Sequence, residues 1–177
     1  MIESAAERMA KIIKAANPDE TASVEAMKYP IAMSMNLLGV VLGCLLVGWI
    51  SGRVGEIFTA FIAFAILRRF SGGYHAKSLS MCVVYSVILF SIIPLIPVND
   101  LTEWILKGVT TLLVLLLAPA NCEQNEIRDS VKGAFRVISI VIVFGQFFIS
   151  SPIITLAFFA QALLLINLKH VKEVIIR

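Results

Sequence analysis

The sequence predicts an all-α polytopic membrane protein with about six transmembrane helices and an amphipathic N-terminal helix. Hydrophobic residues make up 59% of the 177 residues and charged residues only 15%, well below the roughly 25% charged residues of soluble domains. The mean hydropathy is +0.91, and several apolar runs approach the ~20 residues that cross a bilayer as a helix. The chain length suits a single domain.

The first segment is an amphipathic helix over residues 1–16, because apolar residues recur there at helical spacing with charges on the other side. Ser4 and Glu7 fit a capping box at its start. The helix could lie in the membrane interface, grip a partner helix or pack on its own domain. The sequence "NPDE" at 17–20 ends it, since a proline disfavours helical geometry in the residue before it.

Six apolar stretches follow the N-terminal segment 1–30 and precede a tail at 169–177. The second is short and contains Glu56, so its crossing requires flanking arginines that snorkel or a thinner bilayer. The fourth contains Glu103 and Lys107, an i,i+4 pair. The predicted crossings are Ile31–Ile50, Val54–Leu67, Leu79–Val98, Leu101–Ala118, Val137–Ser150 and Pro152–Leu168.

The distribution of basic residues predicts that both termini are cytoplasmic. With that orientation almost every lysine and arginine lies in a cytoplasmic segment, as the positive-inside rule requires. If the last two apolar stretches formed one helix, the three basic residues of the tail at 169–177 would lie outside the cell. We therefore predict that these two stretches form a helical hairpin. The cytoplasmic segments are then 1–30, 68–78, 121–136 and 169–177.

The first predicted crossing carries small residues on one face. Gly39 and Gly43 in "GVVLG", followed by Gly48, form a GxxxG-type contact that is compatible with self-association. A homodimer is therefore expected. Nucleic-acid binding is not, because the basic residues lie at the ends of apolar segments and do not form a stripe.

A polar cluster, "RRFSGGYHAKSLSMC" at 68–82, interrupts the apolar sequence at the cytoplasmic boundary. A cysteine nucleophile needs a neighbouring base, and a histidine is the usual one. A helix N-terminus and nearby cations also favour the thiolate. His75, the basic residues and a helix predicted to begin near 75–78 supply these features for Cys82.

The spacing between His75 and Cys82 sets a geometric condition. Seven helical residues return to one face but are separated by about 10.5 Å along the axis, too far for a good pair. We therefore expect His75 to lie on an irregular turn that Gly72 and Gly73 permit. The competing structural interpretation takes Cys82 as a packing residue and the arginines as topology anchors.

The remaining cysteines and histidine favour structural roles. Cys44 lies in an apolar run, Cys122 in a polar loop and His170 among tail lysines. The three cysteines show neither disulfide nor metal-ligand spacing, so no metal and no cofactor are expected.

The polar cluster resembles the signature of the accessory gene regulator B family, membrane cysteine endopeptidases of peptide quorum sensing. The resemblance rests on the basic residues, Phe70, the glycine pair, His75, Ala76 and Cys82, and "LAPA" at 117–120 fits the family as well. The family commonly continues with an acidic residue and a Lys–Pro pair, whereas this chain reads "NCEQNEIRDSVKG".

The resemblance implies that Cys82 is the nucleophile and His75 its base. The substrate would be a precursor peptide with an amphipathic leader and an acidic tail, which is removed through an acyl-thioester before the autoinducing peptide closes as a thiolactone. Basic residues of the cluster and of the loop that follows "LAPA" would bind the acidic tail of the substrate. Those of the loop serve equally well as anchors of the membrane topology. The candidate substrate-binding residues are Arg68, Arg69, Lys77, Arg128 and Lys132.

Two other classes of function stay open. A small transporter or exporter would use ionisable residues inside the membrane to mark its path, and Glu56, Glu103 and Lys107 are the candidates. A non-catalytic membrane scaffold would present its amphipathic helix to partners.

Overall fold

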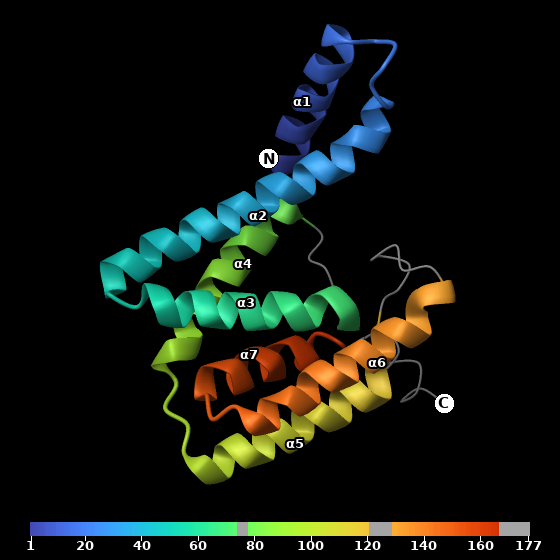
Figure 1. Ribbon diagram of the computed structural model, residues 1–177. Coiled ribbons are helices and arrows are strands. Elements are labelled where there is room, and N and C mark those ends of the chain that lie inside the picture. The colour runs from blue at the N-terminus through green and yellow to red at the C-terminus, as the bar shows by residue number, and fades with distance from the viewer. Residues whose placement is uncertain (74–77, 121–128, 167–177) are drawn as a thin grey trace, which may run out of the picture. The chain divides into compact units, whose positions relative to one another are not determined.

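A computed structural model describes residues 1–73, 78–120 and 129–166, and these residues are helical with no β-strand (Figure 1). The predicted all-α class is confirmed. The α-helices are α1 Ile2–Ala16, α2 Val24–Ser51, α3 Val54–Ser71, α4 Leu79–Ile92, α5 Asp100–Leu117, α6 Asp129–Gly145 and α7 Pro152–Leu163, with short 3₁₀ helices η1 Ile93–Leu95 and η2 Gln146–Phe148.

Two helices in the described residues are long and apolar enough to cross a membrane, α2 and the segment Ser130–Phe148. The segments Leu79–Leu95 and Pro152–Leu163 are apolar but shorter. Helices α3 and α5 have 18 residues, and each contains three charged side chains. Membrane association is therefore supported, while six crossings and their orientation remain predictions.

The chain divides into two compact units. The first comprises Met1–Val54 and Ala76–Ser91, and the second comprises Gly55–His75 and Ile92–Arg177. Helices α1, α2 and α4 thus belong to the first unit, and α5, α6 and α7 to the second.

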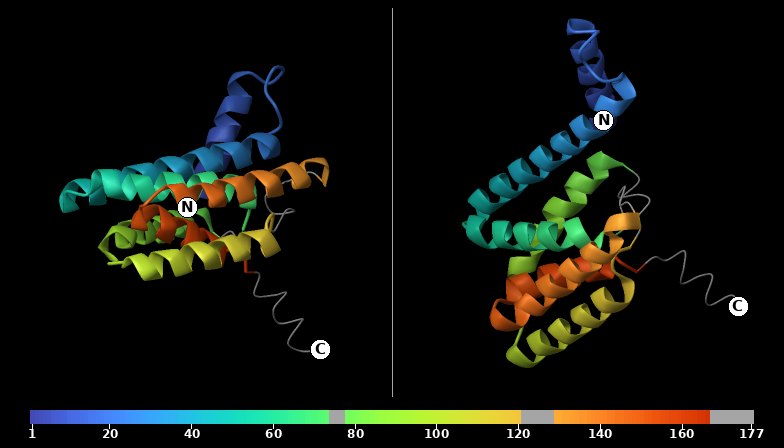
Figure 2. Two further views of the ribbon diagram at one scale, coloured as in Figure 1. Left: turned by 60° about the horizontal axis from the view of Figure 1, so that its bottom comes forward. Right: turned by 45° about the vertical axis from the view of Figure 1, so that its right-hand side comes forward.

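In the first unit, α1 lies alongside the N-terminal part of α2 (Figures 1 and 2). The helix ends at Ala16 as predicted and begins at Ile2, so the predicted Ser4–Glu7 capping box is wrong. Glu7 instead binds Lys11 at 2.7 Å and Lys28 of α2 at 3.0 Å, and both ammonium groups lower the pKa of Glu7 to about 2.

The glycine face of α2 packs against α4 within this same unit. A Cβ added at Gly39 would lie 3.2 Å from Val83 Cγ2, and one at Gly43 would lie only 2.6 Å from Val87 Cγ2. Glycine is required here because a valine of α4 fills the space that a side chain would need. These glycines make a contact inside the chain, so they do not support the expected homodimer, which stays a prediction.

In the second unit, a buried ion pair links helix α5 to its neighbours. Glu103 Oε1 lies 2.8 Å from Lys107 Nζ, and both side chains are buried. Thr155 of α7 donates its hydroxyl to Glu103 at 3.3 Å, and Lys107 Nζ donates to the Ile149 carbonyl at 3.1 Å. The charges that the sequence placed in the fourth crossing therefore hold α5, α7 and the segment before α7 together.

Candidate functional site

The candidate nucleophile Cys82 lies in the first turn of α4, as the sequence predicted. Helix α4 begins at Leu79, and the Cys82 N–H donates to the Ser78 carbonyl at 3.1 Å, the first hydrogen bond of the helix. The Cys82 side chain is half-buried and its thiol is free. The arrangement places a free thiol near the positive end of a helix dipole.

A carboxylate from α1 caps the helix that carries Cys82. The Leu79 N–H donates to Glu3 Oε1 at 2.7 Å, and the Ile2 N–H donates to Ser80 Oγ at 3.2 Å. The two bonds satisfy one backbone donor at the start of α4 and one at the start of α1, which would otherwise be left unpaired. The hydrogen bond from Glu3's own N–H, followed by that from Leu79, lowers the Glu3 pKa below its ordinary value of 4.5. Nothing in the sequence of the polar cluster signalled this contact.

The predicted glycine turn lies directly after α3. Gly72 and Gly73 have φ values of 69° and 123°, a region of backbone geometry that favours glycine. A Cβ at Gly73 would also lie 3.2 Å from Gln161 Nε2 and 3.3 Å from the Leu164 carbonyl oxygen. Both glycines thus have backbone geometry that suits glycine, whereas the irregular turn that they were predicted to permit, over 74–77 with His75 and Lys77, lies outside the described residues.

The segment "LAPA" pairs with this turn. The Ala120 N–H donates to the Ser71 carbonyl at 2.9 Å, and the Gly73 N–H donates to the Ala120 carbonyl at 3.2 Å. The Ala118–Pro119 peptide bond is cis. Two stretches that the sequence singled out separately are thus hydrogen-bonded to each other within the second unit.

Gln161 of α7 binds the same turn from inside the unit. Its Nε2 donates to the Gly72 carbonyl at 2.7 Å and to Ser71 Oγ at 3.0 Å, while its Oε1 accepts from Arg68 Nη1 at 3.2 Å. The Gln161 and Ser71 side chains are fully buried. Sequence reasoning missed Gln161, because one amide in an apolar helix carries no motif.

The predicted substrate-binding cations differ in their surroundings. Arg68 is half-buried, and its guanidinium also lies 5.7 Å from the Phe64 ring. Arg69 is exposed, with its guanidinium 5.8 Å from the Phe135 ring of α6.

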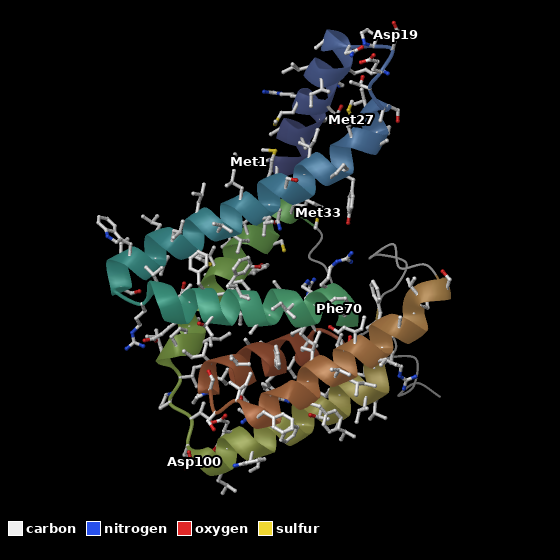
Figure 3. All side chains as sticks on the ribbon, viewed as in Figure 1. Met1, Asp19, Met27, Met33, Phe70 and Asp100 are labelled. Atoms are coloured by element: carbon white, nitrogen blue, oxygen red, sulfur yellow. The ribbon has the colours of Figure 1, made fainter. Side chains whose placement is uncertain are left out.

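Phe70, labelled near the end of α3 in Figure 3, makes an edge contact with Phe135 at 5.5 Å between ring centroids. Lys132 is half-buried on α6. Arg128 lies outside the described residues.

Cys44 is fully buried in α2, in agreement with its predicted packing role. Cys122 and His170 fall outside the described ranges. Among the residues that the structure does describe, no three histidine, cysteine or acidic side chains gather as metal ligands would.

Comparison with known proteins gives one family and several relatives. The sequence profile of the family described as "Accessory gene regulator B" matches residues 6–175. An AgrB-like protein of Halalkalibacterium halodurans is 30% identical over 120 residues, which are 67% of this chain and 61% of the relative. The chain thus matches about three fifths of that relative's length.

Two staphylococcal proteins are also similar. The accessory gene regulator protein B of Staphylococcus aureus strain MW2 is 27% identical over 158 residues, or 81% of this chain and 84% of the relative. The protein of the same name from Staphylococcus carnosus is 28% identical over 102 residues, or 53% of each chain. No solved structure shows significant similarity to the chain.

Proposed function

Because the chain belongs to the accessory gene regulator B family, we propose that it is a membrane cysteine endopeptidase that processes a precursor of a quorum-sensing peptide. The family supplies the quorum-sensing context. The observation that carries the proposal is the free thiol of the half-buried Cys82 in the first turn of α4, seven residues after the histidine that the family pattern pairs with it.

In the proposed reaction, His75 takes the proton of the Cys82 thiol, and the thiolate attacks the carbonyl carbon of the peptide bond before the acidic tail. The C–N bond breaks, the imidazolium returns its proton to the leaving amine, and the rest of the peptide remains on Cys82 as a thioester. A cysteine thiolate of the peptide then attacks this thioester, so that a thiolactone forms and the Cys82 thiolate leaves.

The exchange of one thioester for another is nearly balanced, so exclusion of water must favour ring closure over hydrolysis. The expected partner is the precursor itself, with an amphipathic leader that binds the lipid surface. The basic side chains near the cluster would attract its acidic tail. Of these, Arg69 has the exposure that such a role needs.

The test replaces the two proposed catalytic residues one at a time. Cys82→Ala and His75→Ala are each expected to abolish cleavage of a co-expressed precursor, seen as loss of the shorter peptide by mass spectrometry, without lowering the amount of protein in the membrane. Cys44→Ala removes a buried cysteine of α2 and serves as the control that should still cleave. Normal cleavage by Cys82→Ala would rule out the proposal.

A transporter is the second candidate class, and one observation speaks against it. Of the three ionisable residues that would mark its path, Glu56, Glu103 and Lys107, the last two pair with each other at 2.8 Å and bind α7 and the segment before it. A transporter should tolerate Cys82→Ala but depend on this pair, which is the reverse of the pattern expected for the peptidase.

A further inference from the structure

Basic side chains gather at one end of the second unit, where α3 ends and α6 begins. Contacts inside the unit bring these two helix ends together. The Phe135 ring of α6 lies 5.5 Å from the Phe70 ring and 5.8 Å from the Arg69 guanidinium of α3. We call this the basic end, and its cations are Arg68, Arg69, Lys132 and Arg136.

The carboxylates of the same unit lie at its other end. Among the described side chains they are Glu56 in the first turn of α3 and Asp100 and Glu103 in the first turn of α5. The opposite ends of α3 and α5 meet at the basic end, where the Ala120 N–H donates to the Ser71 carbonyl at 2.9 Å. The described part of the basic end therefore carries an excess of positive charge, which suits an anionic ligand.

Arg136 has both the exposure and the spare donors that such a ligand needs. Its Nη2 donates to the Leu115 carbonyl at 2.9 Å, and among the described residues this is its one hydrogen bond. A guanidinium has five N–H donors in a planar fork that matches the oxygens of a phosphate. Lys132 lies one helical turn before Arg136 on the same face of α6, so a second cation is within reach of the same anion.

Exposed apolar side chains adjoin Arg136 on two helices, α5 and α6, which lie side by side (Figures 1 and 2). Val137 and Val141 are exposed on α6, and Leu112 and Leu116 are exposed on α5, on either side of the carbonyl that Arg136 binds. A free anion or an acidic peptide would use the cations and leave this aliphatic surface bare. An anionic phospholipid would use both, because its headgroup is charged and its chains are apolar.

We propose that Arg136 and Lys132 bind the phosphate of an anionic phospholipid whose acyl chains lie along the exposed apolar side chains of α5 and α6. The site is separate from the proposed peptidase reaction, in which Arg136 has no part. The predicted orientation of the chain gives this end to the cytoplasmic leaflet, where anionic lipids attract basic segments. If Arg136 served only as an anchor of the topology, any exposed arginine should respond to the lipid in the same way.

The experiment measures how lipids protect the full-length protein from thermal unfolding in a neutral detergent. Phosphatidylglycerol is titrated in, and phosphatidylcholine with the same acyl chains and inorganic phosphate are titrated separately. We expect phosphatidylglycerol to raise the melting temperature by roughly 5 °C near saturation. The other two should protect much less, because phosphatidylcholine carries no net charge and inorganic phosphate has no acyl chains.

Three variants locate the protection. Arg136→Gln should raise the half-saturating concentration of phosphatidylglycerol about tenfold, and Arg136→Lys should fall between it and the wild type, since it keeps the charge but not the fork. Arg8→Gln removes the same charge from an exposed position of α1 in the first unit and should titrate like the wild type. Each shift is taken from the variant's own melting temperature, so that loss of the bond to Leu115 does not enter it.

Each other outcome would overturn the inference. Equal weakening by Arg136→Gln and Arg8→Gln would show a diffuse attraction without a site, and a wild-type titration of Arg136→Gln would place the lipid elsewhere. Protection by inorganic phosphate equal to that by phosphatidylglycerol would indicate a site for a bare anion. A glutamate-rich peptide that protects the wild type equally well, but not Arg136→Gln, would assign the site to a peptide. Should Arg136→Gln fail to accumulate, Lys132→Gln is titrated instead, and a wild-type result would count against the site.

Discussion

Gly73 shows how one residue can be constrained by its backbone and by its neighbours at the same time. Its φ of 123° belongs to a region that side-chain-bearing residues rarely adopt, and the nearest atoms to a new Cβ would be 3.2 and 3.3 Å away. One of those atoms is a backbone carbonyl oxygen, which cannot turn aside as a flexible side chain can. The position therefore tolerates glycine alone.

We expect Gly73→Ala to destabilise the protein by about 1–3 kcal/mol and to reduce precursor cleavage. Gly133→Ala is the matched control, since a Cβ at Gly133 in α6 would meet no atom within 4 Å. It should leave stability unchanged or raise it by about 0.5–1 kcal/mol. Thermal unfolding in detergent measures both variants, and equal melting temperatures for Gly73→Ala and the wild type would contradict the prediction.

At the same scale, Glu3 makes the contact between α1 and α4 depend on pH. Because its pKa is lower in the folded chain than the ordinary 4.5, the ionised carboxylate stabilises the fold. This contribution is fully present above pH 4.5 and is lost as the pH falls through the lower folded value.

Glu3→Gln should therefore reduce stability at pH 7 and make little difference once the wild-type carboxylate is protonated. Denaturation midpoints at pH 7 and at successively lower pH would show the loss and its decline as the wild-type carboxylate becomes protonated. Glu25→Gln, which removes an exposed carboxylate from the first turn of α2, is the control. A constant difference between Glu3→Gln and the wild type across this range would exclude the proposed role of the charge.

At the scale of elements, α2 and α4 meet through glycine on one side and valine on the other. The closest approach is at Gly43, where a Cβ would lie 2.6 Å from Val87 Cγ2. The sequence correctly marked these glycines as a helix contact. It could not tell that the partner is α4 of the same chain, because a GxxxG pattern specifies close approach and not the identity of the neighbour.

Gly43→Val should overpack this contact and cost about 1–3 kcal/mol. Adding Val87→Ala removes the methyl groups in the way, so the double variant should regain part of the lost stability. Gly108→Val in α5 introduces the same side chain where nothing lies within 4 Å and controls for helix propensity. Chemical denaturation of the wild type, Gly43→Val, Val87→Ala, the double variant and Gly108→Val measures the effect, and strictly additive losses would show that Gly43 and Val87 do not interact.

The sequence predicted the existence and order of the helices well, and it also placed Cys82 in the first turn of its helix. Those predictions rested on the strong apolar periodicity of the sequence and on the helix-breaking residues at 17–20 and 72–73. It failed for the capping box, because the helix begins before Ser4, and for Glu3 and Gln161, whose partners are distant in the sequence. Contacts of that kind depend on tertiary packing, which no local pattern reveals.

For the whole molecule, exposed apolar side chains support a place in the membrane. In α2, Trp49 and Ile50 are 79% and 74% exposed, and patches of this kind on a soluble protein would associate. In the second unit the ion pair of Glu103 and Lys107 is buried. Charges inside an apolar bundle persist when they are paired, because an isolated charge would be costly.

Replacing one member of this ion pair should destabilise the protein more than replacing both members. Lys107→Met leaves Glu103 without its cation and should cost about 3–5 kcal/mol, whereas Glu103→Leu combined with Lys107→Met should recover much of that loss. Thermal unfolding of the three proteins distinguishes the cases. A double variant that is less stable than Lys107→Met would indicate that Glu103 has a function beyond the pair.

The predicted topology can be tested in whole cells. A maleimide that does not cross membranes should label Ser150→Cys from outside and Ala22→Cys only after permeabilisation, in a background without native cysteines. Both positions are exposed in the structure. Labelling of both residues from the same side would exclude the hairpin that brings the C-terminus back to the cytoplasm.

The hydrogen bonds of Gln161 also bear on how relatives of this chain can diverge. A residue without an amide at this position would leave the buried Ser71 hydroxyl and Gly72 carbonyl without these hydrogen bonds, at about 1–3 kcal/mol for each group, and would also remove the bond to the half-buried Arg68. Natural variants are therefore expected to change position 161 together with 68 or 71. Position 161 should covary with the other two across homologous genes although it lies 90 and 93 residues away from them along the chain.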